Sequence, residues 1–332
     1  MKIHISFLAL LVAATMMLGS CKSAKKTAMA DDEATQLVGP TFSSDSAYAF
    51  ADAQCAFGPR TMNSEAHDRC AQWIANKFAQ YGCEVSTQKA DVKGYDGTTL
   101  HNQNIIARTN PSATRRILLC AHYDSRPWAD NDPDSTNWRK PVMAANDGAS
   151  GIAVMLEVAR IIQADSTLAL GIDFVCFDAE DWGTPQWAES QDSGDTWALG
   201  AQYWAEHVGA ANKPQFGILL DMVGGQGARF YQEGVSKQYA PDVVKKIWRA
   251  ARKAGYGSFF PNSDGGMITD DHVPVNEKAG IPTADIIAYY PDCQQSSFGP
   301  TWHTVSDDMQ HIDPNTLKAV GQVVIQVIYS EK

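Results

Sequence analysis

The chain has 332 residues, enough for one large domain or two small ones, and its 27 Lys and Arg against 38 Asp and Glu give a formal net charge of −11. This acidic balance argues against nucleic acid and anionic membrane surfaces as partners, because both need clustered positive charge. With 44% hydrophobic and 20% charged residues, the composition is that of an ordinary globular protein and excludes a disordered, collagenous or coiled-coil chain.

The first twenty residues predict a targeting signal. An apolar run over residues 5–18 is too short for a permanent transmembrane helix but suits the core of a signal peptide. It ends in Leu18-Gly19-Ser20-Cys21, which resembles a bacterial lipoprotein signal in which the cysteine becomes the lipidated first residue; an ordinary cleaved signal with an incidental cysteine is the alternative. We expect a signal peptide at 1–20, a flexible tether at 21–41 and a domain at 42–332, anchored by lipid to a membrane in the bacterial periplasm.

Helical and extended patterns follow this segment in order. Ser44 is a candidate N-cap for a helix over 45–57, and Asn63 or Ser64 opens a second helix that ends at Tyr81. Three extended runs come next, at 84–90, 104–108 and 116–121. Because an oxidising compartment permits disulfides, Cys55 and Cys70 of the helical region are the pair that we expect to be joined.

From Asp147 onward, helices alternate with apolar strands. The expected elements are a helix at 152–163, a strand at 172–177, a helix at 199–207, a strand at 216–223, a helix at 240–254, a strand at 283–289 and a helix at 314–329. Cys120 and Cys176 sit inside the apolar strands and are expected to be buried thiols. Continuous apolar strands that alternate with helices predict an α/β fold, a single domain with a mixed, mostly parallel central sheet flanked by helices on both faces.

Polar residues stand where these strands end, which is where such sheets place active sites. They are His122 and Asp124 after the strand at 116–121, Glu180 and Asp181 after the next, and Asp221 in the strand at 216–223, with Asp147 at a helix entry. Each has a plainer interpretation: a satisfied histidine, a solvated acidic loop, or a helix N-cap for Asp147. Their joint occurrence at one rim favours a site with the histidine and carboxylate ligands that zinc accepts.

Later loops add Asp270-Asp271-His272 and Trp302-His303, and the ordered set resembles the zinc-dependent aminopeptidase superfamily over nearly all of residues 42–330. Within it, the chain is similar to the glutaminyl cyclases of the animal type and their bacterial relatives. The features are Asp270, where aminopeptidases tend to have Ser, Trp302, where they tend to have Tyr, and Trp187-x-x-Ser190-Gln191-Asp192-Ser193. The chain departs from the family in a Glu-Asp rather than Glu-Glu acidic pair and in Asp285, where the animal enzymes suggest His.

The resemblance implies an enzyme that converts the N-terminal glutamine of peptides and proteins to pyroglutamate and releases ammonia, with one Zn²⁺ per chain. It implies Asp147, Asp181 and His303 as zinc ligands and Glu180 as the general acid and base. It also implies a hydrogen-bonded acid pair of Asp221 and Asp270, with His122 and Asp124 near the metal. Trp187 and Trp302 would bind substrate, while the tryptophans at 128, 138, 182 and 197 are open between core packing and an aromatic rim around a small pocket.

Two other functions stay open at this point. A two-zinc aminopeptidase would find all five ligands in His122, Asp147, Asp181, Asp221 and His303. A ligand-binding member of the superfamily without activity would be expected to have lost ligands, and none is lost here. For partners we expect N-terminal glutamine substrates, no nucleic acid, no membrane contact except through a lipid on Cys21, and a monomer.

Overall fold

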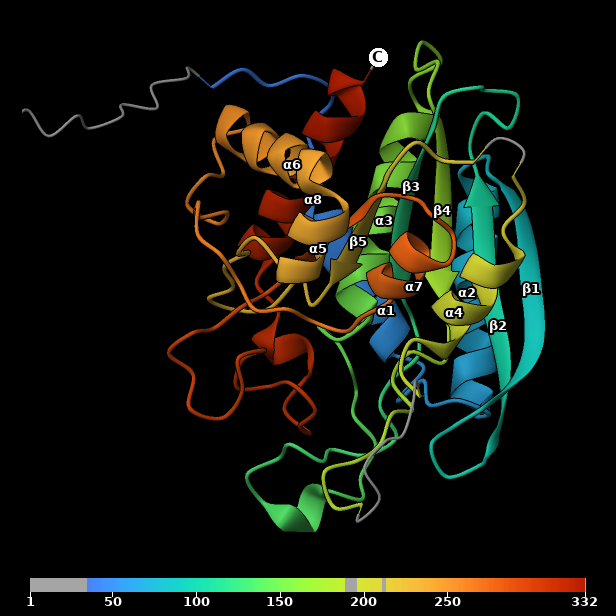
Figure 1. Cartoon of the computed structure of the whole chain (residues 1–332), viewed down its shortest axis with the longest axis vertical. Coiled ribbons are helices and arrows are strands. Elements are labelled where there is room, and N and C mark those ends of the chain that lie inside the picture. Colours follow the sequence, from blue (N-terminus) through green and yellow to red (C-terminus); the bar gives the residue numbers. More distant parts are fainter. Residues whose placement is uncertain (1–34, 189–195, 211–212, 332) are drawn as a thin grey trace, which may run out of the picture. The chain divides into compact units, whose positions relative to one another are not determined.

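The computed structural model describes residues 35–188, 196–210 and 213–331, and Figure 1 shows their helices and strands. The strands are β1 (Glu84–Lys93), β2 (Thr99–Arg108), β3 (Arg116–His122), β4 (Gly171–Phe177), β5 (Gly217–Asp221) and β6 (Thr283–Ile287). The helices are α1 (Ser44–Cys55), α2 (Glu65–Gln80), α3 (Ala149–Gln163), α4 (Leu199–His207), α5 (Gly234–Tyr239), α6 (Pro241–Lys253), α7 (His272–Glu277) and α8 (Pro314–Ser330). None of the helices in these residues is long and apolar enough to cross a membrane.

The strands form one mixed sheet in the order β1-β2-β4-β3-β5-β6. β1 pairs with β2 and β2 with β4 in antiparallel fashion, whereas β4, β3, β5 and β6 are parallel to their neighbours. The register of β3 on β4 runs from Arg116 opposite Gly171 to His122 opposite Phe177. The carboxyl ends of the four parallel strands therefore meet at one edge of the sheet.

Helices cover both faces of the sheet, and the side chains of β3 show why. Ile117, Leu119 and Ala121 face a large apolar cluster that includes residues of α1, α2, α3, α6 and α8, while Leu118 and Cys120 face a second cluster built with α4 and α7. Every residue of β3 is buried, as expected for a strand covered on both sides. Each fully buried Ile or Leu contributes about 1.5–3 kcal/mol, so this sandwich fixes the strand ends rigidly. The predicted fold class is confirmed.

Two short helices were missed by the sequence pattern. The helix expected at 240–254 is α6, and the short α5 directly before it was not predicted; Pro241, in the first turn of α6, separates the two helices. α7 begins at His272, within the segment interpreted as a charged loop. Helices of six residues are too short to show an apolar period.

The N-terminal boundary of the ordered domain also differs from the expectation. Residues 36–40, assigned to a flexible tether, lie along α8: the backbone N–H of Val38 donates to the Gln326 side chain at 3.0 Å, and the Gln322 amide donates to the Pro40 carbonyl at 3.1 Å. Buried glutamines of α8 thus bind the chain before residue 42. Cys21 and the signal at 1–20 lie outside the described residues, as do Ser190-Gln191-Asp192-Ser193.

The predicted disulfide between Cys55 and Cys70 is wrong, because the six cysteines among the described residues are all free. Cys55 ends α1 and Cys70 lies within α2, where both pack with the apolar cluster under the helices. Burial raises the pKa of Cys55 to about 11 and that of Cys70 to about 12, so both remain thiols at neutral pH. Cys120 and Cys176 are fully buried thiols, as expected.

Candidate active site

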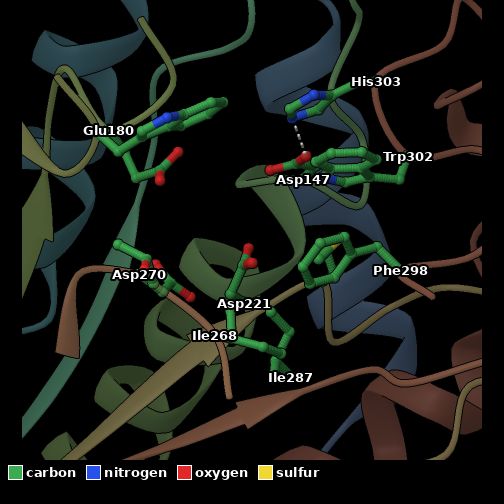
Figure 2. Close-up of a pocket in the computed structure, with 12 residues that line it drawn as sticks. Asp147, Glu180, Asp221, Ile268, Asp270, Ile287, Phe298, Trp302 and His303 are labelled. Carbon is green, nitrogen blue, oxygen red and sulfur yellow. Dashed lines mark ion pairs between the residues drawn. The ribbon is translucent and has the colours of Figure 1, made fainter. Parts of the chain in front are cut away.

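The polar residues predicted from the strand ends meet at the carboxyl edge of the parallel strands. His122 ends β3, Asp221 ends β5, and Glu180 and Asp181 follow β4. Asp147 precedes α3, and His303 comes from the segment between β6 and α8. Figure 2 shows the carboxylates of Asp147, Glu180 and Asp221 pointing toward one space, with His303 beside Asp147.

The backbone around this space is strained. Ala179, Met222 and His303 adopt φ values of 52°, 48° and 54°, a left-handed conformation that costs a residue other than glycine about 1–3 kcal/mol. Surrounding contacts hold these turns: the carboxylate of Asp124 accepts hydrogen bonds from the backbone N–H groups of Glu180 at 3.1 Å and Asp181 at 3.2 Å. Asp124 therefore orients the acidic pair without pointing its charge into the pocket.

Asp147 does not serve as a helix cap. The N-cap of α3 is Gly148, and no side-chain hydrogen bond caps this helix. A Cβ at Gly148 would lie 2.6 Å from the His122 carbonyl oxygen and 2.8 Å from its ring, so only glycine lets the helix start approach β3 this closely. The backbone N–H of Asp147 donates to Asp307 at 3.0 Å. Because the carboxylate of Asp147 caps no helix, it is available to the site.

Asp147, Asp181 and His303 form a group with the donors that a zinc ion needs. Their ligand atoms lie within 4.8 Å of one another, with His303 Nε2 3.3 Å from Asp181 Oδ1 and 3.5 Å from Asp147 Oδ2. All three side chains are buried, and Asp181 Oδ2 has no hydrogen-bond partner among the described residues. A buried carboxylate oxygen without a partner, beside an imidazole, is what zinc coordination requires, so the residues fit the metal.

A second group shares Asp147. His122 Nε2 lies 3.0 Å from Asp147 Oδ1 and 3.3 Å from Asp221 Oδ1, and these three residues could also hold a metal ion. The burial of His122 would lower its pKa, but contacts with Asp124, Asp147 and Asp221 outweigh this and raise the pKa well above its usual value. The neighbouring carboxylates therefore favour the protonated form of His122.

A third group joins Asp270, which lines the pocket, to His272 and Asp285, which do not. Asp270, His272 and Asp285 present ligand atoms within the same short range, and all three are buried. His272 Nε2 lies 3.0 Å from Glu233 Oε2, while neither oxygen of Asp285 has a hydrogen-bond partner in the described part of the chain. Burial raises the pKa of Asp285 well above its usual value, and the charge of Asp270 adds to this. Asp285 is therefore held neutral outside the pocket lining.

The acids of the site line a pocket of about 250 Å³, and apolar side chains form much of the rest of its wall. Trp302 stacks on the His303 ring at 3.8 Å between centroids, and Phe298 packs against Trp302 at 4.8 Å. Figure 2 shows Phe298 and Trp302 on the side of the pocket opposite Glu180 and Asp270. The lining residues are Asp147, Glu180, Trp197, Asp221, Met222, Ile268, Thr269, Asp270, Ile287, Phe298, Trp302 and His303.

Trp187 is not among the residues that line this pocket. It stacks instead on Trp138, with centroids 6.2 Å apart, and the guanidinium of Arg139 lies 4.0 Å from the centre of its ring. Trp128 meets the same ring edge-on at 5.9 Å. Trp187 therefore belongs to an aromatic cluster of the neighbouring loops, and its contact with substrate stays a prediction. The tryptophan that lines the pocket from this region is Trp197.

Glu180, Asp221 and Asp270 in the pocket wall have raised pKa values, whereas contact with His122 outweighs burial and lowers the pKa of Asp147. Burial, followed by the charge of Asp181, raises the pKa of Glu180 well above its usual value. Burial raises the pKa of Asp221 to about 6, and burial with the charge of Asp221 raises that of Asp270 to about 7. Carboxyls that gain or lose protons near neutral pH are suited to general acid and base catalysis.

The predicted hydrogen bond between Asp221 and Asp270 is not formed. Asp221 Oδ1 faces His122, and Asp270 Oδ2 has no hydrogen-bond partner within the described residues. The two acids share the pocket and interact through their charges, as the raised pKa of Asp270 shows. Asp221 Oδ1 lies instead 3.3 Å from His122 Nε2.

Sequence reasoning missed the apolar pocket residues Met222, Ile268, Ile287 and Phe298, which have no pattern that separates them from core residues. Phe298 stands four residues before Trp302 in the same loop, which is the one signal that could have found it. It also missed Arg126, which contacts Asp181, and Asp130, which contacts His303.

Comparisons with known proteins agree with this architecture. The model of peptidase family M28 matches residues 104–328. The chain is similar to the solved glutaminyl cyclases from Tannerella forsythia (52% identity, TM-score 0.85, 88% of this chain and 100% of that chain) and Bacteroides thetaiotaomicron (48%, 0.86, 89% and 100%). It is also similar to a Zn-dependent exopeptidase from Parabacteroides distasonis (45%, 0.85, 88% and 99%).

Among curated proteins, the chain is 28% identical over 240 residues to aminopeptidase YwaD of Bacillus subtilis, covering 70% of this chain and 45% of that protein. It is 26% identical over 250 residues to the glutaminyl-peptide cyclotransferase of Bos taurus, covering 67% of this chain and 64% of that protein. The chain thus spans less than two thirds of the length of these two relatives. The family match and the near-complete coverage of the solved structures show that this chain belongs to peptidase family M28, within the superfamily that its ordered acids and histidines resemble.

Proposed function

We propose that the protein is a zinc-dependent glutaminyl-peptide cyclotransferase, which converts an N-terminal glutamine to pyroglutamate with release of ammonia. The observation that carries this proposal is the small pocket in which Glu180, Asp147 and His303 meet aromatic walls, which are formed by Trp197, Phe298 and Trp302. A pocket of about 250 Å³ suits one folded glutamine side chain rather than a length of peptide. The glutaminyl cyclases from two bacteria that share about half of its residues support the same activity.

Zinc would be held by Asp147, Asp181 and His303, and when bound it supplies Lewis acidity toward an amide carbonyl oxygen. Glu180 takes one proton from the α-amine as its nitrogen forms a bond to the side-chain carbonyl carbon. The bond from that carbon to the amide nitrogen breaks, and Glu180 returns the proton to this nitrogen, so that ammonia leaves. Glu180 lines the pocket, where a carboxyl group can accept and then donate a proton.

The apolar walls supply the remaining requirement, which is geometry. Since the nucleophile is part of the substrate, the enzyme mainly has to fold the glutamine side chain back toward its own amine. Trp302, fixed by its stacking on His303, and Phe298 would hold the methylene groups in this folded form. Asp270, titrating near 7, would present a hydrogen-bonding carboxyl to the substrate amide at neutral pH.

A two-zinc aminopeptidase is the second candidate, and the group of His122, Asp147 and Asp221 is the observation that favours it. A two-metal site would stabilise attack by a hydroxide on a peptide bond. We propose a single zinc, as the resemblance to the glutaminyl cyclases implies, with His122 and Asp221 in contact with each other beside it.

The cellular setting is a proposal from the sequence. We propose that Cys21 carries a lipid and holds a monomeric enzyme at a periplasmic membrane surface, where it meets peptides and proteins with N-terminal glutamine. The support is the Leu18-Gly19-Ser20-Cys21 pattern after the apolar run.

Mass spectrometry of two matched peptides, one beginning with Gln and one with Leu, tests the proposed activity. The expected result is loss of one ammonia from the Gln peptide with its backbone intact and no change in the Leu peptide. Release of free leucine together with an unchanged Gln peptide would show the aminopeptidase instead.

A further inference from the structure

Arg126 lies four residues beyond the end of β3, and its guanidinium is buried. Its N–H donors point at the metal group, defined as Asp147, Asp181 and His303, or at residues next to this group. The Arg126 side chain is 1% exposed. Nε and Nη2 each donate to one oxygen of Asp130 at 2.8 Å, and Nη1 donates to the carbonyl of Asp181 at 3.1 Å and to Asp181 Oδ1 at 3.2 Å. A forked pair with both carboxylate oxygens is the most directional contact that an arginine makes.

Arg126 leaves one oxygen of Asp181 free. Asp181 Oδ1 lies against Arg126 and His303, whereas Oδ2 is buried and has no hydrogen-bond partner among the described residues. Rotating this carboxylate would break the contact with Arg126. The side chain is therefore held in an orientation that offers a single oxygen.

Asp130 contacts His303 of the metal group, as Arg126 contacts Asp181. Its Oδ1 lies 3.5 Å from His303 Nδ1, and its Oδ2 accepts the backbone N–H of Gln186 at 3.0 Å. Arg126 and the backbone N–H of Gln186 together hold both oxygens of Asp130 in place. A carboxylate at Nδ1 favours a proton there and leaves Nε2, the nitrogen that faces Asp147 and Asp181, as the metal-binding atom.

The guanidinium also supports the pocket wall. Its central carbon lies 4.7 Å from the ring centre of Trp197 and 5.3 Å from that of Trp128. Trp197 in turn lies nearly parallel to the His303 ring, at 8° and 6.1 Å. One side chain thus contacts a metal-group carboxylate, the anion beside the histidine and an aromatic wall.

We propose that Arg126 and Asp130 are positioning residues of the metal site, which fix Asp181 as a ligand through Oδ2 and His303 as a ligand through Nε2. This inference rests on the proposed function, in which Asp147, Asp181 and His303 hold zinc. Residues that orient metal ligands in this way typically control metal affinity 10- to 100-fold.

The test compares zinc affinity in variants of two buried Arg–Asp pairs. Arg116 and Asp173 provide the matched control, because Arg116 is 2% exposed and donates to Asp173 at 2.8 Å from the opposite end of β3. Zinc dissociation constants of the full-length protein would be measured by chelator competition for Asp130→Asn, Arg126→Lys, Arg126→Gln and Asp173→Asn. Unfolding of each zinc-free variant would be recorded in parallel.

Asp130→Asn and Arg126→Gln are expected to weaken zinc binding 10- to 100-fold, and Arg126→Lys to weaken it less, because it keeps the charge without the fork. Asp173→Asn should lower the melting temperature but leave zinc affinity unchanged. The visible spectrum of the cobalt(II)-loaded protein should change in Asp130→Asn and not in Asp173→Asn, a difference that a purely structural role would not produce.

Two results would overturn the inference in distinguishable ways. If the natural protein binds zinc but Asp130→Asn and Arg126→Lys bind it equally well with the same cobalt spectrum, the positioning role is wrong and the proposed function stands. If the natural protein binds no zinc, the proposed metal site fails and the inference fails with it.

Discussion

Replacing Asp270 with Asn should change how the stability of the zinc-free protein depends on pH. The Asp270 carboxyl titrates at about 7 in the folded chain instead of 3.8, because it is buried beside Asp221. A raised pKa means that the folded state holds the proton more tightly, so the free energy of unfolding falls as pH rises from 3.8 through 7. At about 1.4 kcal/mol for each pKa unit, ionised Asp270 costs the folded state on the order of 4 kcal/mol above pH 7.

Asp270→Asn removes this ionisation while its side-chain oxygen can still accept the backbone N–H of Asp271. Urea unfolding of the chelator-treated proteins from pH 4 to pH 8 should show the variant gaining up to about 4 kcal/mol over the natural chain across this range. The control is Asp264→Asn, an exposed carboxylate paired with Lys237, which should change stability by less than about 1 kcal/mol at every pH. Parallel pH profiles for Asp270→Asn and the natural chain would refute the reasoning.

Three further predictions concern activity and location. Glu180→Gln should lower cyclisation by about 10²- to 10⁴-fold with zinc content unchanged, because a carboxamide cannot carry the proton; loss of zinc would mean that Glu180 and Asp181 have exchanged roles. Trp302→Ala should raise KM for a Gln peptide on the order of 10-fold, because the pocket loses the ring that stacks on His303, and an unchanged KM would contradict this role of the wall. Cys21→Ser should move the enzyme from membrane to soluble fractions, and unchanged membrane association would argue against lipidation.

The sequence could predict that the polar residues of the site come together, because the direction of the parallel strands places them at one edge of the sheet. His122, Glu180, Asp181 and Asp221 end or follow parallel strands, and parallel strands bring their carboxyl ends to one edge whatever the details of packing. The apolar runs also predicted α4 at its observed bounds, Leu199–His207. The bounds of a regular helix can be predicted in this way because they depend mainly on the residues of the helix itself.

Side-chain pairing could not be predicted in the same way. Asp221 faces His122 rather than bonding to Asp270, and Trp187 stacks on Trp138 rather than lining the pocket. Both outcomes depend on which of several possible partners lies nearest in the folded protein, and this distance cannot be read from the sequence. Phe298, like the other apolar pocket residues, cannot be told from a core residue in the sequence. Cys55 and Cys70 remained thiols because proximity in a helical region does not set the geometry of a disulfide.

Zinc titration of the zinc-free enzyme tests the central claim most directly. Ammonia release from a Gln peptide and amino-acid release from a Leu amide would be followed in the same samples as zinc is added. We predict that ammonia release reaches its maximum at about one zinc per chain, with no hydrolysis of the Leu amide at any point. Activity that needs two zinc ions per chain, together with release of leucine, would contradict the account and identify an aminopeptidase.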